Sequence, residues 1–273
     1  MTSCAMPARA LGRFDRRLRR AAQLRARHAF ASQWLELYER LLPVQRSACA
    51  AALQARPAAH ELADYVAARS APVAVAVAIA HGPPALADAL RQQANGARAA
   101  VARWLQGEIL PPVENFLARA AAAPVLEALA ADGIAEGAAG DRGAGDRGAG
   151  HCPQCGGLPQ VAFTVRSDDA LVTAARRLSC ARCGSEWSCA QLQCVACGES
   201  ARDRLHGHTD AERLPHLRAD ACASCRSYVI HVDLRADADA VPEVDELVAA
   251  PIDLCMQARG FGKLVPNLMG IGW

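Results

Sequence analysis

Four short segments decide the fold of this chain: Cys152-Pro-Gln-Cys155, Cys180-Ala-Arg-Cys183, Cys194-Val-Ala-Cys197 and Cys222-Ala-Ser-Cys225. The spacing of the first two, C-x2-C-x24-C-x2-C, recurs in the last two at a constant offset of 42 residues. Matched spacings of this kind indicate a duplicated unit. Thiolates are soft ligands, and two facing Cys-x-x-Cys turns supply the four sulfurs of a tetrahedral zinc or iron site. The repeat therefore predicts two metal sites.

The pairing of the four turns follows from the repeat, because each copy contains a complete set of four cysteines. Sequential pairing gives each copy its own ion, and crossed pairing of the first turn with the third is the alternative. We expect sequential pairing. The predicted ligands of the first site are Cys152, Cys155, Cys180 and Cys183, and those of the second site are Cys194, Cys197, Cys222 and Cys225.

Glycine follows the second cysteine of three turns, at Gly156, Gly184 and Gly198. Glycine at this place predicts a backbone with positive φ, which also directs N–H groups at the sulfurs. The fourth turn has Arg226 instead, so we expect it to be less regular.

The ligands alone leave two metals open, since both zinc and iron accept four thiolates. Zinc would be structural, whereas iron could also carry one electron. A small ribbon has too little apolar core to fold alone, and structural zinc contributes about 10–16 kcal/mol to finger peptides. Replacing a ligand cysteine by serine should therefore unfold a ribbon.

The remaining cysteines and histidines carry weaker signals. Cys189 lies between two turns and could compete as a ligand, and His151 could support the first site as a hydrogen-bond donor. The other candidates are expected to be ordinary core, surface or loop residues, and they are Cys4, Cys49, Cys255, His206, His208 and His216. No catalytic arrangement of side chains is evident, so we expect a protein that is not an enzyme.

Composition divides the chain near residue 133. The first part is rich in alanine and carries helical periodicity interrupted by prolines, and Leu35, Tyr38, Leu41 and Leu42 would form one apolar stripe. Residues 73–79 alternate Val and Ala, which leaves a strand as the alternative to a helix. We expect a helix there, and an all-α domain over residues 1–132.

The glycine-rich segment 133–150 contains the pentapeptide Gly-Asp-Arg-Gly-Ala twice and predicts a flexible linker. Beyond it, strands are expected at residues 158–165, 176–179, 186–192 and 227–234. Residues 243–259 read as a helix that Pro251 should kink or end early.

The predicted fold class is therefore α+β, with an all-α N-terminal domain, two tandem rubredoxin-like or zinc-ribbon Cys4 modules, and a C-terminal helix. The predicted domains are residues 1–132, the linker 133–150, the first ribbon 151–192, the second ribbon 193–235 and the helical tail 236–273.

The charge and hydropathy patterns limit the location and the partners. The net charge is only +2, although nine arginines fall within residues 9–40. These arginines suit either a solvated helix face or a surface for an acidic partner. Residues 1–30 lack the apolar run of an export signal, and the longest uncharged apolar run, residues 71–80, is about half a membrane span. We expect a cytoplasmic protein without membrane insertion, in which disulfides are disfavoured.

With these residues in view, the chain resembles FdhE, the formate dehydrogenase accessory protein family. The motifs that carry the resemblance are His151-Cys-Pro-Gln-Cys-Gly-Gly157, Leu178-Ser-Cys-Ala-Arg-Cys-Gly-Ser-Glu-Trp187, Cys194-Val-Ala-Cys-Gly198 and Asp245-Glu-Leu-Val-Ala-Ala-Pro-Ile-Asp253. The likeness extends over nearly the whole chain, with Gly260-Phe261 and Asn267-Leu268 in the tail and weaker matches in the helical part. Pro251 and the long linker depart from the pattern.

The resemblance implies a cytoplasmic, non-catalytic protein needed for active respiratory formate dehydrogenase. It implies binding to the catalytic subunit of that enzyme, without nucleic acid as a partner. It also implies two rubredoxin-like iron ions, one at each cysteine site, and zinc is the alternative metal at both. Whether the sites have a redox role is left open.

Two other functions remain open from the residues. A double zinc ribbon could be a nucleic-acid adaptor, although the ribbons are not basic overall and carry few stacking aromatics besides Trp187 and Tyr228. A pair of rubredoxin-like sites could also form a dedicated electron carrier. The oligomeric state is not indicated.

Overall fold

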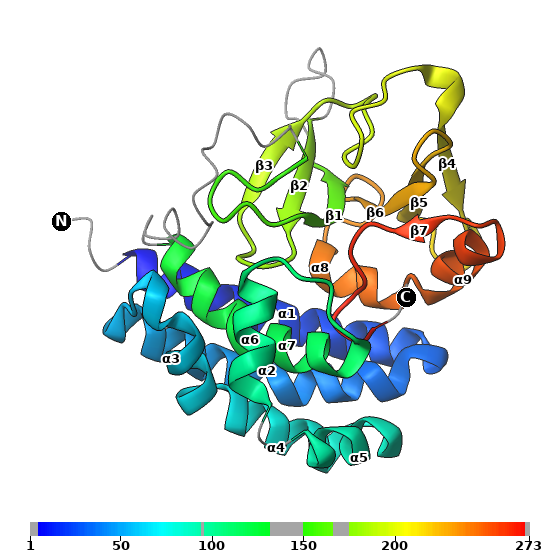
Figure 1. Ribbon diagram of the computed structural model, residues 1–273. Helices are drawn as coiled ribbons and strands as arrows, with labels where there is room; N and C mark the ends of the chain where they lie inside the picture. Colours follow the sequence, from blue (N-terminus) through cyan, green and yellow to red (C-terminus); the bar gives the residue numbers. More distant parts are fainter. Residues whose placement is uncertain (1–4, 94–95, 132–149, 166–174, 271–273) are drawn as a thin grey trace. The chain divides into compact units, whose positions relative to one another are not determined.

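The computed structural model describes residues 5–93, 96–131, 150–165 and 175–270. The described chain divides into two compact units, the first built from helices α1 to α7 and the second from the described strands with helices α8 and α9 (Figure 1). The predicted α+β class is confirmed. The linker expected at residues 133–150 lies outside the described residues, except for Gly150.

The first unit is helical throughout. Its helices are α1 (Ala5–Arg27), α2 (Ser32–Ala55), α3 (Leu62–Arg69), α4 (Ala71–His81), α5 (Pro84–Gln92), α6 (Ala97–Leu105) and α7 (Pro112–Ala131). Residues 73–79 belong to α4, so the helix predicted there is confirmed. Helix α2 packs against both α1 and α7. The predicted stripe of Leu35, Tyr38, Leu41 and Leu42 is buried in this core.

Several arginines of the basic N-terminal segment have partners inside the first unit. The Arg17 guanidinium donates to both carboxylate oxygens of Glu127 at 2.9 and 3.0 Å, and both side chains are buried. Arg25 is paired with Glu39, an ion pair between α1 and α2. Part of the arginine excess therefore stabilises helix packing.

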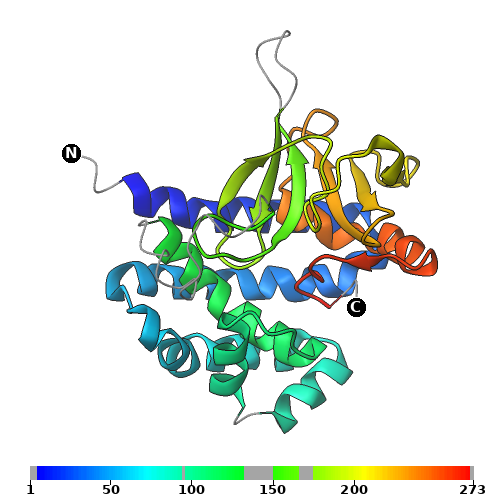
Figure 2. The same cartoon turned by 45° about the horizontal axis from the view of Figure 1, so that its top comes forward.

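Among its described residues, the second unit contains one seven-stranded sheet. Its strands are β1 (Pro159–Thr164), β2 (Arg176–Cys180), β3 (Glu186–Cys189), β4 (Leu205–Thr209), β5 (Leu217–Cys222), β6 (Ser227–Asp233) and β7 (Gly262–Lys263). The first six are arranged in the order β3-β2-β1-β6-β5-β4, and β7 pairs with β6 (Figure 2). Strands β1, β2, β3 and β6 confirm the strands predicted from the sequence.

The strand order reflects the repeat. Strands β2 and β5 are antiparallel partners of β3 and β6, and residues 176 and 186 lie 42 positions before residues 218 and 228. The first module contributes strands β1, β2 and β3, and the second contributes β4, β5 and β6. These two sets of three strands join through β1 and β6, which pair in parallel from Val161 opposite Ile230 to Thr164 opposite Asp233. The two cysteine modules are thus parts of one sheet.

The core of the sheet is shared by both modules. Ala162 on β1, Leu178 on β2 and Val229 on β6 form one buried cluster. Trp187 and Val195 pack against it. Burial of these side chains stabilises the junction by about 25 cal/mol per Å² of apolar surface removed from water.

Two local predictions were incomplete. The stretch between Gly198 and Ala221, for which no strand was predicted, contains strand β4 and most of β5. The expected tail helix is interrupted, as predicted from Pro251, but into three short pieces, α8 (Pro242–Asp245), a 3-10 turn (Glu246–Val248) and α9 (Ala250–Ala258). The break falls at Ala249, and Pro251 lies in the first turn of α9, where its missing N–H costs nothing.

Candidate metal centres

The first cysteine group contains Cys152, Cys155, Cys180 and Cys183, whose sulfurs all lie within 4.8 Å of one another. Cys180 is the last residue of β2. The other turn, Cys152–Cys155, lies shortly before β1, which begins at Pro159. The Sγ atoms of Cys155 and Cys180 are 3.4 Å apart. All four residues are at most 4% exposed. The structure therefore brings together the four residues predicted for the first site.

The second group contains Cys194, Cys197, Cys222 and Cys225, again with all sulfurs within 4.8 Å of one another. Sulfur pairs across the two turns are separated by 3.7 Å (Cys194 and Cys225) and 3.8 Å (Cys197 and Cys222). Cys222 is buried, Cys194 and Cys225 are half-buried, and Cys197 is exposed. The arrangement is the sequential pairing expected from the repeat.

The backbone of the turns has the geometry that the glycines predict. Gly156, Gly184 and Gly198 have φ values of 69°, 63° and 80°. The N–H of Gly156 donates to the carbonyl of Cys152, and the N–H of Gly198 donates to that of Cys194, both at 2.9 Å. The first and third cysteine pairs are thereby held in tight turns.

Arg226 adopts the same left-handed conformation as those glycines, with φ 59°. Its N–H donates to the carbonyl of Cys222 at 2.9 Å, so the fourth turn closes like the others. The guanidinium donates to the carbonyl of Arg259 and stacks on the Phe261 ring, 4.1 Å from its centroid. The expectation of a less regular turn was wrong, because these contacts hold the arginine in place.

The thiols of the second group have unequal acidities. Burial raises the pKa of Cys194 to about 12. Burial also acts on Cys225, but hydrogen bonds from the backbone and side chain of Ser227 outweigh it and lower the pKa to about 7. Four soft sulfur donors at these separations fit a single tetrahedral zinc or iron ion per group. Such an ion favours the thiolate form of every ligand.

The weaker candidates lie outside both groups. Cys189, half-buried at the end of β3, belongs to neither sulfur cluster, and Cys49 is buried in α2 while Cys255 is exposed on α9. His206 and His208 are on β4, not on a loop as expected. Cys4 falls outside the described residues.

His216 contributes to a third cluster that the sequence did not indicate. Its Nε2 lies 2.8 Å from Oδ1 of buried Asp245, and Asp237 is close enough to complete a possible set of ligands. The second oxygen of Asp245 accepts the N–H of Val241. Both oxygens of Asp245 thus already bond to protein groups, which favours a structural role.

A polar network crosses the junction between the two modules. His231 on β6 lies 2.7 Å from the hydroxyl of Thr164 on β1 and 2.9 Å from the carboxylate of Asp220 on β5. Arg176 on β2 and Arg218 on β5 donate to the two oxygens of the same carboxylate at 3.1 and 2.7 Å. We assign the Nδ1 hydrogen of His231 to Asp220.

This network determines the ionisation of its members. Burial of Asp220 alone would raise its pKa, but the contacts with His231, Arg176 and Arg218 outweigh burial and lower it. Burial lowers the pKa of His231, which is consistent with a neutral imidazole. The hydroxyl, imidazole and carboxylate follow the order of a hydrolytic triad, but Thr164 and His231 are both buried. The network is therefore a tie between strands.

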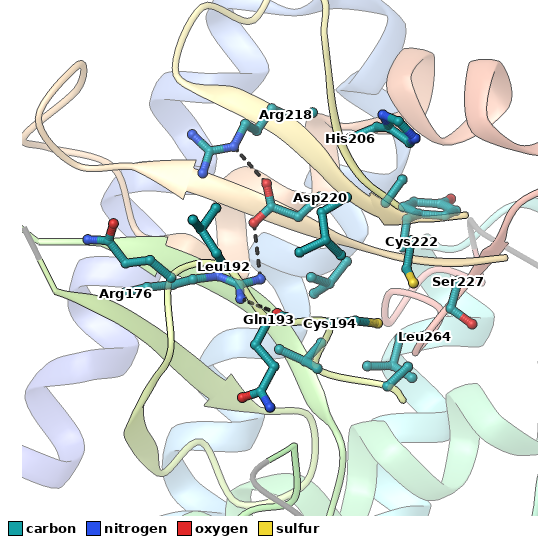
Figure 3. A pocket seen from close by; sticks show the side chains of 18 residues that line it. Arg176, Leu192, Gln193, Cys194, His206, Arg218, Asp220, Cys222, Ser227 and Leu264 are labelled. Carbon is teal, nitrogen blue, oxygen red and sulfur yellow. Dashed lines mark hydrogen bonds and ion pairs between the residues drawn. The ribbon is translucent and has the colours of Figure 1, made fainter. Parts of the chain in front are cut away.

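A pocket of about 170 Å³ opens beside the second cysteine group. In Figure 3, Arg176 and Arg218 flank Asp220 at one end of it, and the sulfurs of Cys194 and Cys222 lie at the other. The walls between them are largely apolar and include Val195, Leu205, Val229 and Leu264.

The chain's one lysine lies in a buried ionic cluster at the end of the sheet. The ammonium of Lys263 on β7 contacts Glu246 and lies 2.9 Å from Asp253, which also accepts the Tyr228 hydroxyl at 2.9 Å. Burial alone would lower the pKa of Lys263, but the two carboxylates raise it. The cluster ties α9 and β7 to β6.

Within the described residues, no single helix is long and apolar enough to span a membrane. One bent pair, residues 59–69 with residues 71–81, passes the test of length and composition only when the two helices are combined.

Comparison with known proteins supports the resemblance drawn from the sequence. Residues 192–269 match the family described as "FdhE, C-terminal domain". The "Protein FdhE homolog" of Aquifex aeolicus is 35% identical over 120 residues, which are 44% of this chain and 41% of that protein. That of Pseudomonas putida is 36% identical over 121 residues, which are 43% of this chain and 37% of that protein. The matched region thus spans about two fifths of these relatives.

The fold has a counterpart among solved structures. The crystal structure of the FdhE protein from Pseudomonas aeruginosa superposes with a TM-score of 0.67 over 94% of this chain and 95% of that chain, at 24% sequence identity. The family model matches the second cysteine module and the tail, whereas the likeness in fold covers 94% of this chain. The predicted resemblance to FdhE is confirmed.

Proposed function

We propose that this FdhE-like chain is a non-catalytic accessory protein for the maturation of respiratory formate dehydrogenase, acting in the cytoplasm. The observation that carries the proposal is the pair of four-sulfur clusters inside a sheet whose C-terminal region matches the FdhE family. This role requires no active site. The protein would act by binding the enzyme that it helps to mature.

We propose that each cysteine group holds one ion, with the turns paired sequentially; the closeness of the four sulfurs within each group supports this pairing. Iron is the metal that the resemblance implies, and zinc fits the same donors. The ion would supply two things: the folding energy of the module and, with iron, a one-electron couple. Elemental analysis with a visible spectrum of anaerobically purified protein distinguishes the metals.

The proposed partner is the catalytic subunit of formate dehydrogenase. A pull-down with the full, metal-loaded chain from cell extract is expected to capture this subunit. The matched controls are Cys155→Ser, which removes a buried ligand, and Cys255→Ser, which changes an exposed cysteine outside both groups. We expect capture to be lost in the first variant and retained in the second. Failure of the intact protein to capture the subunit contradicts the proposal.

A second function, electron carrier, is favoured by one observation. Cys197 is exposed, so a sulfur of the second group lies at the molecular surface, where an electron could leave. A carrier predicts a coloured iron protein that is bleached by dithionite. A colourless zinc protein that supports formate dehydrogenase activity in cells excludes this function and leaves the accessory role standing.

A further inference from the structure

We propose that the two cysteine groups have different tasks: the second is an exchange site that gains and releases its soft divalent ion, whereas the first retains its ion and is structural. The inference rests on the metal binding proposed above. It assigns the exchange to movement of one turn, Cys194–Cys197.

The first observation is the difference in burial. The four cysteines of the first group are buried, at most 4% exposed, whereas Cys197 of the second group is exposed and Cys194 and Cys225 are half-buried. A ligand can be replaced only where an incoming donor atom can approach the ion. Water and small chelators can reach the second group directly, but they reach the first only after the module opens.

The second observation is the unequal anchoring of the two turns of the second group. Cys222 is the last residue of β5, and Cys225 lies two residues before the start of β6, so the sheet holds this turn from both sides. The turn Cys194–Cys197 follows β3 by a stretch without regular structure and precedes a 3-10 turn at Arg202–Arg204. It lies outside every strand. This turn can move without breaking the sheet.

The third observation is loose packing around the same turn. The pocket of about 170 Å³ is lined by Cys194, Val195 and Ala196 (Figure 3), and another hollow of about 360 Å³ is lined by all residues from Cys194 to Gly198. The two hollows border the turn, and its apolar packing is made by Val195, which lies against the buried cluster of the sheet. Local opening is least costly where apolar contacts are few.

One hydrogen bond links the two turns across the second group. The Ser224 hydroxyl donates to Oε2 of Glu199 at 2.7 Å, and Oε1 of Glu199 accepts the N–H groups of Ser200 and Ala201 at 2.9 and 3.0 Å. Ser224 is exposed and Glu199 is half-buried, so water competes for these bonds. The Glu199–Ser224 hydrogen bond therefore stabilises the closed turn without locking it.

Release then proceeds through the exposed ligand. Cys197 would be displaced first by a donor atom of the incoming chelator, and its sulfur would take a proton from water. Cys194 would follow in the same way, and Cys222 and Cys225 would be the last residues to hold the ion. Uptake is the reverse, with the proton returned to water.

The test uses the full chain loaded with zinc. The chelator 4-(2-pyridylazo)resorcinol in excess reports release by its colour, and N-ethylmaleimide with peptide mass spectrometry reports which cysteines become free. One zinc per chain is expected to leave at least about tenfold faster than the other, which is a barrier difference of about 1.4 kcal/mol. Labelling is expected at Cys197 and Cys194 before any cysteine of the first group.

Two variants test the role of the linking hydrogen bond. Ser224→Ala and Glu199→Gln are each expected to speed the fast phase by about fivefold, the scale of one hydrogen bond to a charged group partly replaced by water. The slow phase should not change. Ser188→Ala, which alters an exposed serine on β3, is the matched control and should leave both phases as they are.

Three results would overturn the inference: equal release of both ions, labelling that begins in the first group, or linking-bond variants that behave like the Ser188→Ala control. These failures differ from a failure of the proposed function. A chain that takes up no zinc refutes the metal binding on which the inference rests, whereas lost capture of the catalytic subunit refutes the partner and leaves the order of release unaffected.

Discussion

Arg226 shows how single residues decide the turns of this protein. Three turns place glycine at the left-handed position, and the fourth places an arginine there with φ 59°. A side chain in this conformation costs about 1 kcal/mol relative to glycine. The contacts with Arg259 and Phe261 offset that cost.

Substitutions at Arg226 separate the cost of the left-handed backbone conformation from the stabilisation by the contacts with Arg259 and Phe261. Arg226→Ala keeps the unfavourable conformation and loses both contacts, whereas Arg226→Gly loses the contacts but relieves the conformation. We expect Arg226→Ala to have a free energy of unfolding about 1 kcal/mol lower than Arg226→Gly. Urea denaturation of the two metal-loaded variants measures the difference. An alanine variant as stable as the glycine variant would contradict the assignment.

Asp220 gives a prediction about pH. Its pKa is lowered in the folded protein, so its stabilising contribution is fully present above the ordinary carboxyl pKa of about 4 and declines as the pH falls below it. Asp220→Asn removes the partner shared by Arg176 and His231 and should lower the free energy of unfolding at pH 7 by about 2–3 kcal/mol.

The pH dependence of the free energy of unfolding shows whether the charge of Asp220 is responsible for this stabilisation. The difference between wild type and Asp220→Asn should shrink as the pH is lowered from about 5 towards 3, since the carboxyl of the unfolded chain takes up a proton near its ordinary pKa of about 4 while that of the folded protein stays ionised. Asp203→Asn is the matched control, because the Asp203 side chain is 80% exposed and its ion pair with Arg204, at 3.7 Å, is open to solvent. This substitution should change the free energy of unfolding by less than about 0.5 kcal/mol. A difference that stays constant with pH would exclude the ionic explanation.

At the scale of the element, the buried lysine decides how the tail is held. Lys263, Glu246 and Asp253 have side chains about 1% exposed, so removing the ammonium leaves two carboxylates buried without their cation. Lys263→Met should lower the free energy of unfolding of the second unit by about 3–5 kcal/mol. Arg235→Met, at an exposed ion pair with Asp233, should cost less than about 1 kcal/mol. Thermal unfolding that ranks the two variants equally would refute this role.

The elements also show what a sequence can reveal. Strands β2, β3, β5 and β6 flank the repeated cysteine turns. Val, Ile and Tyr mark β6, whereas β2 and β3 were predicted from their places beside the cysteine turns. Strand β4 was missed because Leu205-His-Gly-His-Thr209 has almost no pattern of apolar residues. Such a pattern is not required there, since β4 lies at the edge of the sheet and most of its residues are exposed. An interruption of the tail was predicted from Pro251, but its place at Ala249 was not, because proline looks the same in sequence whether it begins a helix or ends one.

At the scale of the whole molecule, the sequence predicted the sulfur groups but not their common sheet. The ligands are identified by spacing alone, and the structure brings all eight together as expected. The parallel pairing of β1 with β6 has no local signal, because alternation defines a face of a strand but not its partner. For the same reason the network of Thr164, His231 and Asp220 could not be seen, since its members come from three strands.

The shared sheet predicts that damage to one module spreads to the other. Cys155→Ser should expose β1, and because β1 pairs with β6, amide hydrogen exchange should accelerate about tenfold or more at Val229 and Ile230 in the second module. Exchange measured by mass spectrometry tests this, with Cys255→Ser as the unaffected control. Full protection of β6 in Cys155→Ser would mean that the modules fold independently.

The central claim is that two sulfur quartets hold two ions and thereby organise the second unit. Native mass spectrometry of the full chain, purified without oxygen, tests it most directly. We predict two bound ions in the wild type and in Cys255→Ser, and loss of the first-group ion in Cys155→Ser. A wild-type chain that is folded yet carries no ion would contradict the claim.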